Sequence, residues 1–315
     1  MNLSELRYIV ALARERHFGR AAAASFVSQP TLSVAVKKLE GELGVALFER
    51  ASQEVRVTPT GERVVEKAQQ ALEAIESVRQ EALCDGDQLA SPLRIGAIFT
   101  VGPYLFPDLI INLRDSAPQM PLLIEENYTA VLTEKLKNGE LDVIIISLPF
   151  DEPNILTLPL YDEPFIILLP AAHPLTNRKT LKSKNLEDET ILMLGAGHCF
   201  RDQVIKACPA CAPHDGSAVY TAEGSSLETI RHMVASGMGV TVLPCTAAGA
   251  DRYSQRLLAI CRFASPVPSR VVALAWRASF TRPEVIDVLR DTISASQLSC
   301  IHPISRKKGA HKKTG

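Results

Sequence analysis

The sequence predicts a helical N-terminal domain, one long connecting helix and a two-lobed α/β domain. Three observations support this fold class: apolar residues at helical spacing in the first quarter, a coiled-coil spacing after them, and alternating strand and helix patterns from Pro92. The 315 residues also exceed the ~100–200 residues of one typical domain. We expect an N-terminal domain over 1–58, a linker helix and hinge over 59–90, an α/β domain over 91–300, and a basic, disordered tail over 301–315.

Three helices and a hairpin account for the N-terminal domain. The expected apolar faces are Leu6, Ile9, Val10 and Ala13 in the first helix, the Ala-rich run 20–24 in the second, and Leu32, Val36, Leu39 and Leu43 in the third. Ser28 can cap the third helix, and Pro30 suits its first turn, where a missing N–H costs nothing. Residues 47–50 and 55–58 predict a short hairpin, so the whole domain is expected to be a winged helix-turn-helix.

The third helix is expected to contact DNA. Between Arg14 and Lys38, five cations oppose the single acid Glu15, although the net charge of the whole chain is only −1. Cations contact phosphates, while base edges are read from the exposed start of a recognition helix. The predicted DNA-binding residues are Arg20, Ser28, Gln29, Pro30, Thr31, Ser33, Lys37, Lys38 and Arg50. The alternative interpretation is a solvated charged face on a helical bundle.

A long helix is predicted to begin at Thr58-Pro59. Its apolar residues are spaced four and three apart, as in a coiled coil: Val64, Ala68, Ala71, Ile75, Val78 and Ala82. A seam on a helix between two domains has no core of its own, so we expect it to pair with a second copy and form a dimer.

The remaining chain alternates between strand and helix patterns, which predicts βαβ units and a mainly parallel sheet. Strands are expected over 93–98, 122–126, 143–147, 165–169, 240–243 and 270–276, and helices over 103–115, 129–138, 200–207, 226–236 and 283–294. Two such sets predict two lobes around a cleft, where open α/β sheets bind ligands.

Composition narrows the possible classes of protein. The hydrophobic content of 46% and the charged content of 22% are typical of globular proteins. The longest apolar stretch, 164–172, is far shorter than the ~20 residues of a membrane span. Residues 1–20 carry charges throughout, unlike a signal peptide. We expect a cytoplasmic, nucleoid-associated protein with no cofactor and no resident metal.

Seven cysteines are scattered along the chain: Cys84, Cys199, Cys208, Cys211, Cys245, Cys261 and Cys300. An odd number in a cytosolic chain predicts reduced thiols rather than a disulfide framework. Cys199 differs from the rest, because His198 and Arg201 flank it and glycines before it lead into a helix whose free N–H groups favour an anion. Nine residues of helix would hold Cys199 and Cys208 ~13 Å apart, beyond the ~7 Å limit for a disulfide. Bonding them would require melting the helix.

The first sixty residues resemble the LysR-type transcriptional regulators. The resemblance is carried by Leu-Arg-Tyr at 6–8, His-Phe-Gly-Arg-Ala-Ala at 17–22, Ser-Gln-Pro-Thr-Leu-Ser at 28–33, Leu-Phe-Glu-Arg at 47–50 and Thr-Pro-Thr-Gly at 58–61. It implies a winged helix-turn-helix, a long linker helix and a two-lobed, periplasmic-binding-protein-like effector domain. It also implies a homodimer or homotetramer on double-stranded promoter DNA, with RNA polymerase as a further partner.

Residues 195–208 are similar to the peroxide-sensing branch of that family, in the run Gly-Ala-Gly-His-Cys-Phe-Arg-Asp-Gln at 195–203 and the interval to Cys208. The similarity implies that hydrogen peroxide oxidises Cys199 and that Cys208 closes a reversible disulfide, which glutaredoxin or thioredoxin reduces. It also implies a regulator that activates oxidative-stress defence genes and is not an enzyme. The implied peroxide-binding residues are Thr100, Thr129, His198, Asp202 and Arg270.

Four alternatives stay open at the level of sequence. Cys211 forms a Cys-x-x-Cys with Cys208 and could compete as the resolving thiol. His198, Cys199, Cys208, Cys211 and His214 could instead bind zinc. The cleft could hold an organic anion while Cys199 is a bystander, or the chain could be a thiol peroxidase.

Overall fold

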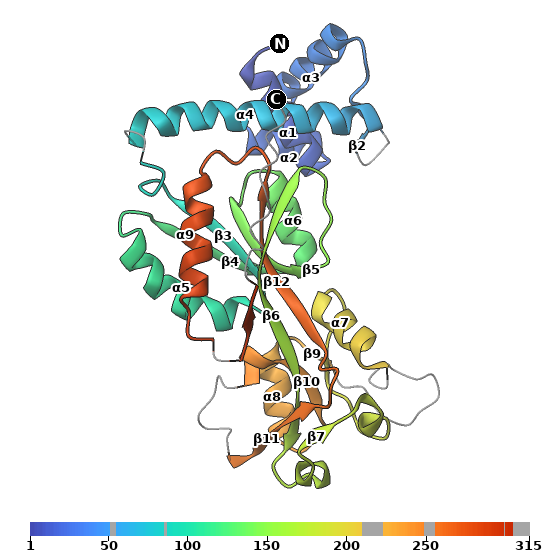
Figure 1. Cartoon of the computed structure of the whole chain (residues 1–315). Coiled ribbons are helices and arrows are strands. Elements are labelled where there is room, and N and C mark those ends of the chain that lie inside the picture. The colour runs from blue at the N-terminus through green and yellow to red at the C-terminus, as the bar shows by residue number, and fades with distance from the viewer. Residues whose placement is uncertain (51–54, 85–86, 210–222, 249–255, 299, 305–315) are drawn as a thin grey trace, which may run out of the picture.

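The computed structural model describes residues 1–50, 55–84, 87–209, 223–248, 256–298 and 300–304 (Figure 1). Its N-terminal domain has three helices and a two-stranded wing, followed by one long helix: α1 (Leu3–Glu15), α2 (Phe18–Ala24), α3 (Gln29–Leu43), β1 (Phe48–Arg50), β2 (Val55–Val57) and α4 (Pro59–Cys84). Ser28 caps α3 by accepting a hydrogen bond from the Thr31 N–H at 3.3 Å, and Pro30 lies in the first turn, as predicted. Leu32, Val36 and Leu39 face the core of this domain.

The helix α4 leaves less of its seam free than the coiled-coil spacing predicts. Ala68 is buried in the core of the N-terminal domain, and Val64 and Ala71 pack against the same core because α4 lies across α1. Beyond that point Val78 is 69% exposed. The prediction of a seam without a core of its own is therefore wrong for the first half of α4, which the chain's own α1 covers.

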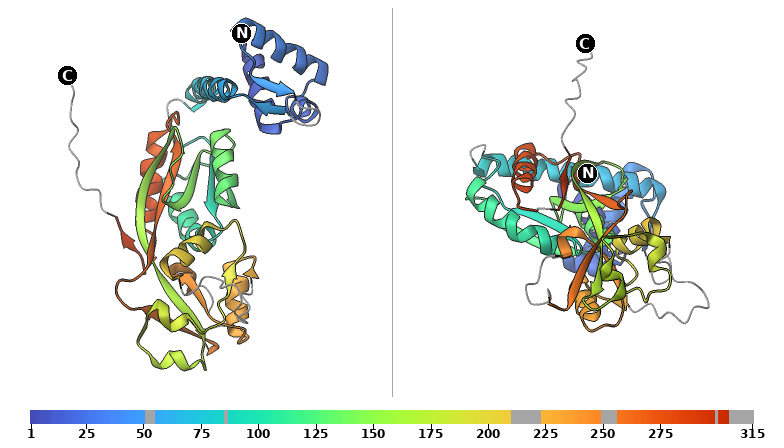
Figure 2. Two further views of the ribbon diagram at one scale, coloured as in Figure 1. Left: turned by 90° about the vertical axis from the view of Figure 1, so that its right-hand side faces the viewer. Right: turned by 60° about the horizontal axis from the view of Figure 1, so that its bottom comes forward.

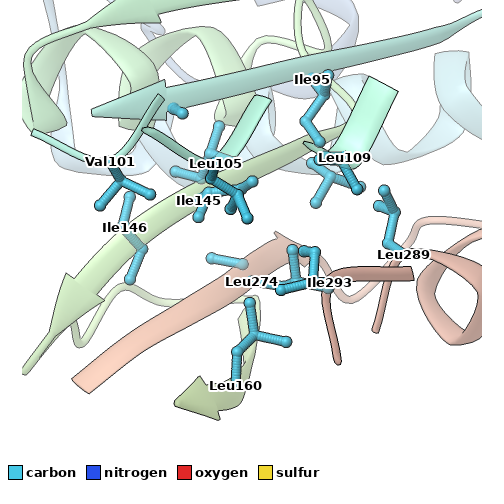
Figure 3. Close-up of a cluster of buried hydrophobic side chains, with 14 of the residues drawn as sticks. Ile95, Val101, Leu105, Leu109, Ile145, Ile146, Leu160, Leu274, Leu289 and Ile293 are labelled. Carbon is cyan, nitrogen blue, oxygen red and sulfur yellow. The ribbon is translucent and has the colours of Figure 1, made fainter. Parts of the chain in front are cut away.

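The first lobe of the α/β domain contains β3 (Leu93–Ile98), α5 (Gly102–Ser116), β4 (Leu122–Asn127), α6 (Thr129–Lys137), β5 (Val143–Leu148), β12 (Ser269–Arg277) and α9 (Pro283–Ser294). Side chains from strands and helices that are far apart in the sequence interlock in its core, among them Ile95, Leu105, Ile145, Leu274 and Leu289 (Figure 3). The helices α5 and α9 pack together on one side of the sheet and α6 lies on the other (Figure 2).

The second lobe is joined to the first by the 16-residue strand β6 (Ile155–Pro170). Its other elements are η1 (Pro174–Asn177), β7 (Thr180–Leu181), η2 (Ser183–Leu186), β8 (Met193–Leu194), α7 (Cys199–Ala207), β9 (Glu223–Gly224), α8 (Leu227–Ala235), β10 (Thr241–Pro244), η4 (Cys245–Ala248) and β11 (Leu258–Phe263). A separate apolar core, which includes Phe165, Leu192 and Ile230, fills this lobe. After α9 the chain returns as β13 (His302–Pro303), which pairs with β6.

The prediction of a mainly parallel sheet is wrong. The strand β3 is parallel to β4 and β5, but β12 is antiparallel to β5 and β6, and β10 and β11 are antiparallel to β6. The predicted strand 165–169 is only the end of β6, because Pro159, Pro164 and the acids between them interrupt its apolar pattern. The register of β12 shifts between Val272 and Ala273, beside Pro159, which is where a bulge accommodates a proline.

The N-terminal domain and α4 contact the first lobe directly. Arg277 on β12 pairs with Glu73 on α4 at 2.7 Å, and Arg14 on α1 lies 3.4 Å from Glu140. A cavity of about 670 Å³ lies between these surfaces. Across the described ranges, no helix combines the length and apolar character that a membrane crossing requires.

A pair of glycine substitutions tests the junction between the wing and α4. A Cβ on Gly61 would lie 2.1 Å from the Leu47 carbonyl oxygen, whereas a Cβ on Gly41 in α3 would meet nothing within 4 Å. We expect Gly61→Ala to lower the free energy of unfolding by about 1–3 kcal/mol through overpacking. Gly41→Ala should raise it by up to about 1 kcal/mol through helix propensity. Urea unfolding followed by helical circular dichroism measures both, and equal effects would contradict the described junction.

Candidate functional site

Cys199 begins α7 at the junction of the two lobes. Gly197 has a φ of +94°, a left-handed conformation that favours glycine, and this turn leads the chain into the helix. The Cys199 side chain is half-buried and packs against the core of the first lobe, although α7 packs mainly in the second. At this end of a helix the backbone N–H groups have no intrahelical partner, and they favour negative charge on the sulfur.

Cys208 caps the opposite end of α7. It is 1% exposed and lies in the core of the second lobe, where its Sγ is 3.1 Å from the Ser183 hydroxyl. The rise of α7 separates the Cα atoms of Cys199 and Cys208 by ~13 Å, so a disulfide between them requires α7 to unwind.

A buried ion pair links the region of Cys199 to the first lobe. Arg270 is 3% exposed and donates from Nε to Glu163 at 2.7 Å. Its Nη1 and Nη2 donate to the hydroxyl and the carbonyl of Thr100 at 2.7 and 2.8 Å. The guanidinium carbon lies 5.2 Å from the centre of the Phe200 ring. The structure thus brings the predicted residues Thr100 and Arg270 into contact, and it adds the fully buried Glu163, which the sequence reasoning missed.

His198 lies against two aromatic rings. The centroid of its ring is 4.7 Å from that of Tyr128 and 5.9 Å from that of Phe99. Burial lowers the pKa of His198 below 6.5, so the folded protein favours the neutral imidazole near neutral pH. The lowered pKa reduces the positive charge that His198 can supply beside Cys199.

Two ionisable residues in the first turn of α7, Arg201 and Asp202, have contacts or exposure that do not involve Cys199. Arg201 donates to the Leu194 carbonyl at 3.0 Å and pairs with Glu223, so its charge is already compensated. Asp202 is exposed on α7, and no hydrogen bond or ion pair joins it to another described residue. Among the described residues at the start of α7, neither of these side chains therefore brings an uncompensated positive charge.

Two buried side-chain oxygens, one on α6 and one on α7, have no hydrogen-bond partner among the described residues. They are the Oγ1 of Thr129, at the start of α6, and the Oε1 of Gln203, on α7. The Nε2 of Gln203 donates to the Ser147 hydroxyl at 2.9 Å, which ties α7 to β5. Unsatisfied buried polar atoms are rare and cost ~1–3 kcal/mol each, so they indicate sites where a polar molecule can bind. Gln203 is the last residue of the motif at 195–203 but is not among the predicted site residues.

One cysteine pair contradicts the expectation of scattered reduced thiols. Cys245 and Cys300 form a disulfide with a distance of 6.1 Å between their Cα atoms. The sequence gives no signal for this pairing, because the segment after α9 reaches the second lobe only through the tertiary fold. Cys261 is a buried thiol, and burial raises its pKa.

The zinc site and the competing resolving thiol that the sequence left open both involve residues outside the described ranges. Cys211 and His214 lie outside the described residues, as does the side chain of Cys84. Within the part of the chain that the structure describes, no group of three or more His, Cys, Asp and Glu side chains could hold a metal ion.

The predicted DNA-binding residues other than Arg50 lie on α2, at the N-cap of α3 or on α3. Those that are exposed are Arg20, Ser28, Gln29, Pro30, Thr31, Lys37 and Lys38, whereas Ser33 is half-buried. Lys38 lies 2.7 Å from the carboxylate of Glu5, so part of its charge is compensated within the domain. The side chain of Arg50 lies outside the described residues.

Comparisons with known proteins cover nearly the whole chain. The family "Bacterial regulatory helix-turn-helix protein, lysR family" matches residues 3–62, and "LysR substrate binding domain" matches residues 86–297. The DNA-binding transcriptional dual regulator OxyR of Escherichia coli K12 is 38% identical over 277 residues, which cover 88% of this chain and 90% of the relative. Full-length OxyR of Pseudomonas aeruginosa, solved as a cysteine-to-aspartate variant, is 53% identical with a TM-score of 0.79 and covers 98% of this chain and 99% of that one. A hydrogen-peroxide-bound OxyR mutant of Corynebacterium glutamicum is 34% identical with a TM-score of 0.62, over 93% and 91% of the two chains.

The burial of His198 predicts that stability falls on acidification. Its pKa is lowered in the folded state, so between that value and 6.5 the unfolded chain binds a proton that the folded chain does not. The free energy of unfolding should decrease as the pH falls through this window and level off below the folded pKa. Urea unfolding from about pH 7.5 to about pH 5.5 measures the slope, which should be smaller in His198→Asn.

The matched control is His232→Asn, at an exposed position on α8. It should keep the slope of the unsubstituted chain. Equal slopes in the unsubstituted chain and in His198→Asn would show that the imidazole of His198 does not contribute.

Proposed function

The chain belongs to the LysR family of bacterial regulators, and from that premise we propose that it is a DNA-binding transcription regulator switched by hydrogen peroxide. The observation that carries this proposal is the placement of two thiols at opposite ends of α7, Cys199 at the lobe junction and Cys208 in the core of the second lobe. The helix keeps the thiols apart, so oxidation that joins them changes the local fold. The relatives named hydrogen peroxide-inducible genes activators support the same function.

The proposed chemistry has two balanced steps. The Cys199 thiolate attacks one oxygen of hydrogen peroxide, the O–O bond breaks, and sulfenic acid and hydroxide form. The Cys208 thiol then attacks the Cys199 sulfur and displaces the second oxygen as water, which leaves a Cys199–Cys208 disulfide. Two electrons pass from the thiols to the peroxide, and glutaredoxin or thioredoxin returns them in the reverse reaction.

The residues around Cys199 have distinct proposed roles. Thr129 offers an unpartnered hydroxyl to a peroxide oxygen, and Thr100 is held by Arg270 so that its position is fixed. The neutral ring of His198 can donate or accept one hydrogen bond, and the N-terminus of α7 favours the thiolate. Asp202 faces solvent in this arrangement, so its proposed role requires α7 to move.

The N-terminal domain supports a function on double-stranded DNA. The exposed start of α3 carries Gln29, Pro30 and Thr31, which suits entry into a major groove, while Arg20 and Lys37 suit phosphates. The exposed side chain of Val78 on α4 supports pairing with a second copy. We place this homodimer or homotetramer in the cytoplasm at promoter DNA, where it acts with RNA polymerase and is not an enzyme.

The switch is tested on the full chain with one equivalent of hydrogen peroxide. Peptide mass measurement should show the loss of two hydrogens and a Cys199–Cys208 link, and the DNA footprint should change at the same time. Cys199→Ser should abolish both changes. Cys261→Ser is the control, because Cys261 is a free thiol buried in the second lobe, and both changes should persist in it.

Other outcomes separate the alternatives. An unchanged thiol count would contradict the switch, and a Cys199–Cys211 link would reassign the resolving thiol. Induction that survives in Cys199→Ser and follows an organic anion would favour a small effector in the cleft. Sustained peroxide consumption with thioredoxin at ordinary enzyme rates would favour a thiol peroxidase.

The unpartnered hydroxyl of Thr129 allows a second test. Thr129→Val should slow oxidation of Cys199 about tenfold or more, because a donor to the peroxide is lost. The free energy of unfolding should stay equal or rise by about 1 kcal/mol, because a buried unsatisfied group is removed. The rate comes from stopped-flow or quenched mass measurement of Cys199.

Thr133→Val on the same helix is the control. The Thr133 hydroxyl already donates to the Thr129 carbonyl at 2.7 Å, so its removal should lower stability slightly and leave the oxidation rate unchanged. An unchanged rate in Thr129→Val would remove Thr129 from the proposed peroxide site.

A further inference from the structure

We propose that Cys245 and Cys300 form a second redox-active pair, a thiol–disulfide modification site that positions Glu163 and thereby Arg270 beside the peroxide site. The proposal rests on the proposed function for the consequence at Cys199, but not for the existence of the pair. It starts from the disulfide between η4 and the segment after α9.

The pair fastens the C-terminal segment across both lobes. Helix α9 belongs to the first lobe, whereas Cys300 packs against the core of the second lobe and Ile301 touches both cores. Shortly after Cys300, His302 pairs with Asp162 and Pro303 with Tyr161, and the Ile304 N–H donates to the Leu160 carbonyl. The bond therefore anchors a short strand along β6, immediately before Glu163.

The other partner of the bond reaches Glu163 through its next residue. The Thr246 N–H donates to Glu163 Oε1 at 3.3 Å, and the Thr246 hydroxyl bonds the same oxygen. The remaining oxygen of Glu163 accepts from Arg270, which holds Thr100. One continuous set of contacts thus runs from Cys245 to Thr100, and both sides of the bond border Glu163.

The exposure of the two cysteines sets the order of the reaction. Cys300 is half-buried and Cys245 is 8% exposed, so Cys300 is the first to meet a small molecule. In closure, the Cys300 thiolate attacks one sulfur of a low-molecular-weight disulfide and releases one small thiolate. The Cys245 thiolate then attacks the Cys300 sulfur and releases the second. Two protein thiols lose two electrons and two protons, and the small disulfide becomes two thiols.

The open form has a place for the freed thiol. The Sγ of Cys245 lies 3.3 Å from the Cys300 carbonyl oxygen, so after reduction the Cys245 thiol can donate a hydrogen bond to it. Reduction removes the covalent tie but not the pairing of β13, and we expect the segment 300–304 to loosen without the lobe unfolding. Thr246, which hydrogen-bonds Glu163, then no longer follows a cross-linked residue, while the pairing of β13 with β6 remains.

The existence of the pair is tested in a Cys199→Ser/Cys208→Ser chain, in which the first switch is absent. The chain is equilibrated in buffers of reduced and oxidised glutathione and quenched, and the Cys245–Cys300 bond is counted by mass. We expect the bond to open and close reversibly with the glutathione ratio. A bond that never forms, or one that excess reduced glutathione never opens, would overturn the proposal.

The coupling to Glu163 is tested in the same chain by amide hydrogen exchange. Opening the bond should speed exchange about tenfold in peptides that contain Thr246 and residues 160–163, because their N–H groups lose anchored partners. Peptides from β3 and β5 serve as the internal reference and should not change. Equal exchange in the two redox states would break the link between the pair and Glu163.

The consequence at Cys199 is measured as the rate of Cys199 oxidation. The reference is the unsubstituted chain with Cys199 and Cys208 reduced and the Cys245–Cys300 bond closed. Relative to it, Cys300→Ser, Cys300→Ala and full reduction of the unsubstituted chain should each slow this oxidation by about tenfold. Cys261→Ser should not. Thr246→Val should also slow the reaction, and Thr246→Ser, which keeps the hydroxyl, should restore it.

The outcomes distinguish the two proposals. If the unsubstituted chain forms no Cys199–Cys208 bond, the proposed function fails, while the glutathione and exchange measurements still decide the second pair. If that bond forms at the same rate with the second pair open or closed, the positioning role of Cys245 and Cys300 is overturned.

Discussion

The ion pair between Arg270 and Glu163 is the constraint on which the site depends. Burying two charges is costly unless each is paired and its remaining polar atoms are hydrogen-bonded, and removing one partner of such a pair typically costs ~3–5 kcal/mol. Here Thr100 completes the contacts of Arg270, and Thr246 completes those of Glu163. Because Thr100 belongs to the first lobe and Thr246 to the second, one electrostatic cluster joins the two lobes.

The helix α7 packs against both lobes. Its first turns contact the first lobe, through His198 against Tyr128 and through Gln203 to Ser147. Its apolar side and Cys208 lie in the core of the second lobe. Unwinding α7 thus disturbs contacts on both sides of the junction, which gives a local covalent change a route to the arrangement of the whole domain.

Periodicity predicted the local elements well, and tertiary contacts explain the misses. Helix α9 spans 283–294 as predicted. The strand predicted at 165–169 covers only the end of β6, because prolines interrupt the apolar pattern of β6. The first half of the α4 seam is covered by α1, and Cys245 bonds Cys300, which is 55 residues away in the sequence. Local residue spacing cannot reveal either of these tertiary contacts. At the site, the resemblance supplied Thr100 and Arg270. The neutral state of His198 and the role of Glu163 depend on burial, which a single sequence does not encode in any local pattern.

The length of α7 also has a consequence in time. Cys208 can reach Cys199 only while the helix is unwound, and local unfolding occurs on the scale of microseconds to seconds. A sulfenic acid at Cys199 must therefore persist until such an opening, and an oxidation that is reversed sooner leaves no disulfide. The local stability of nine residues then acts as a filter on the duration of the signal, so that substitutions in α7 far from either sulfur would change which exposures to oxidant are registered and which are ignored.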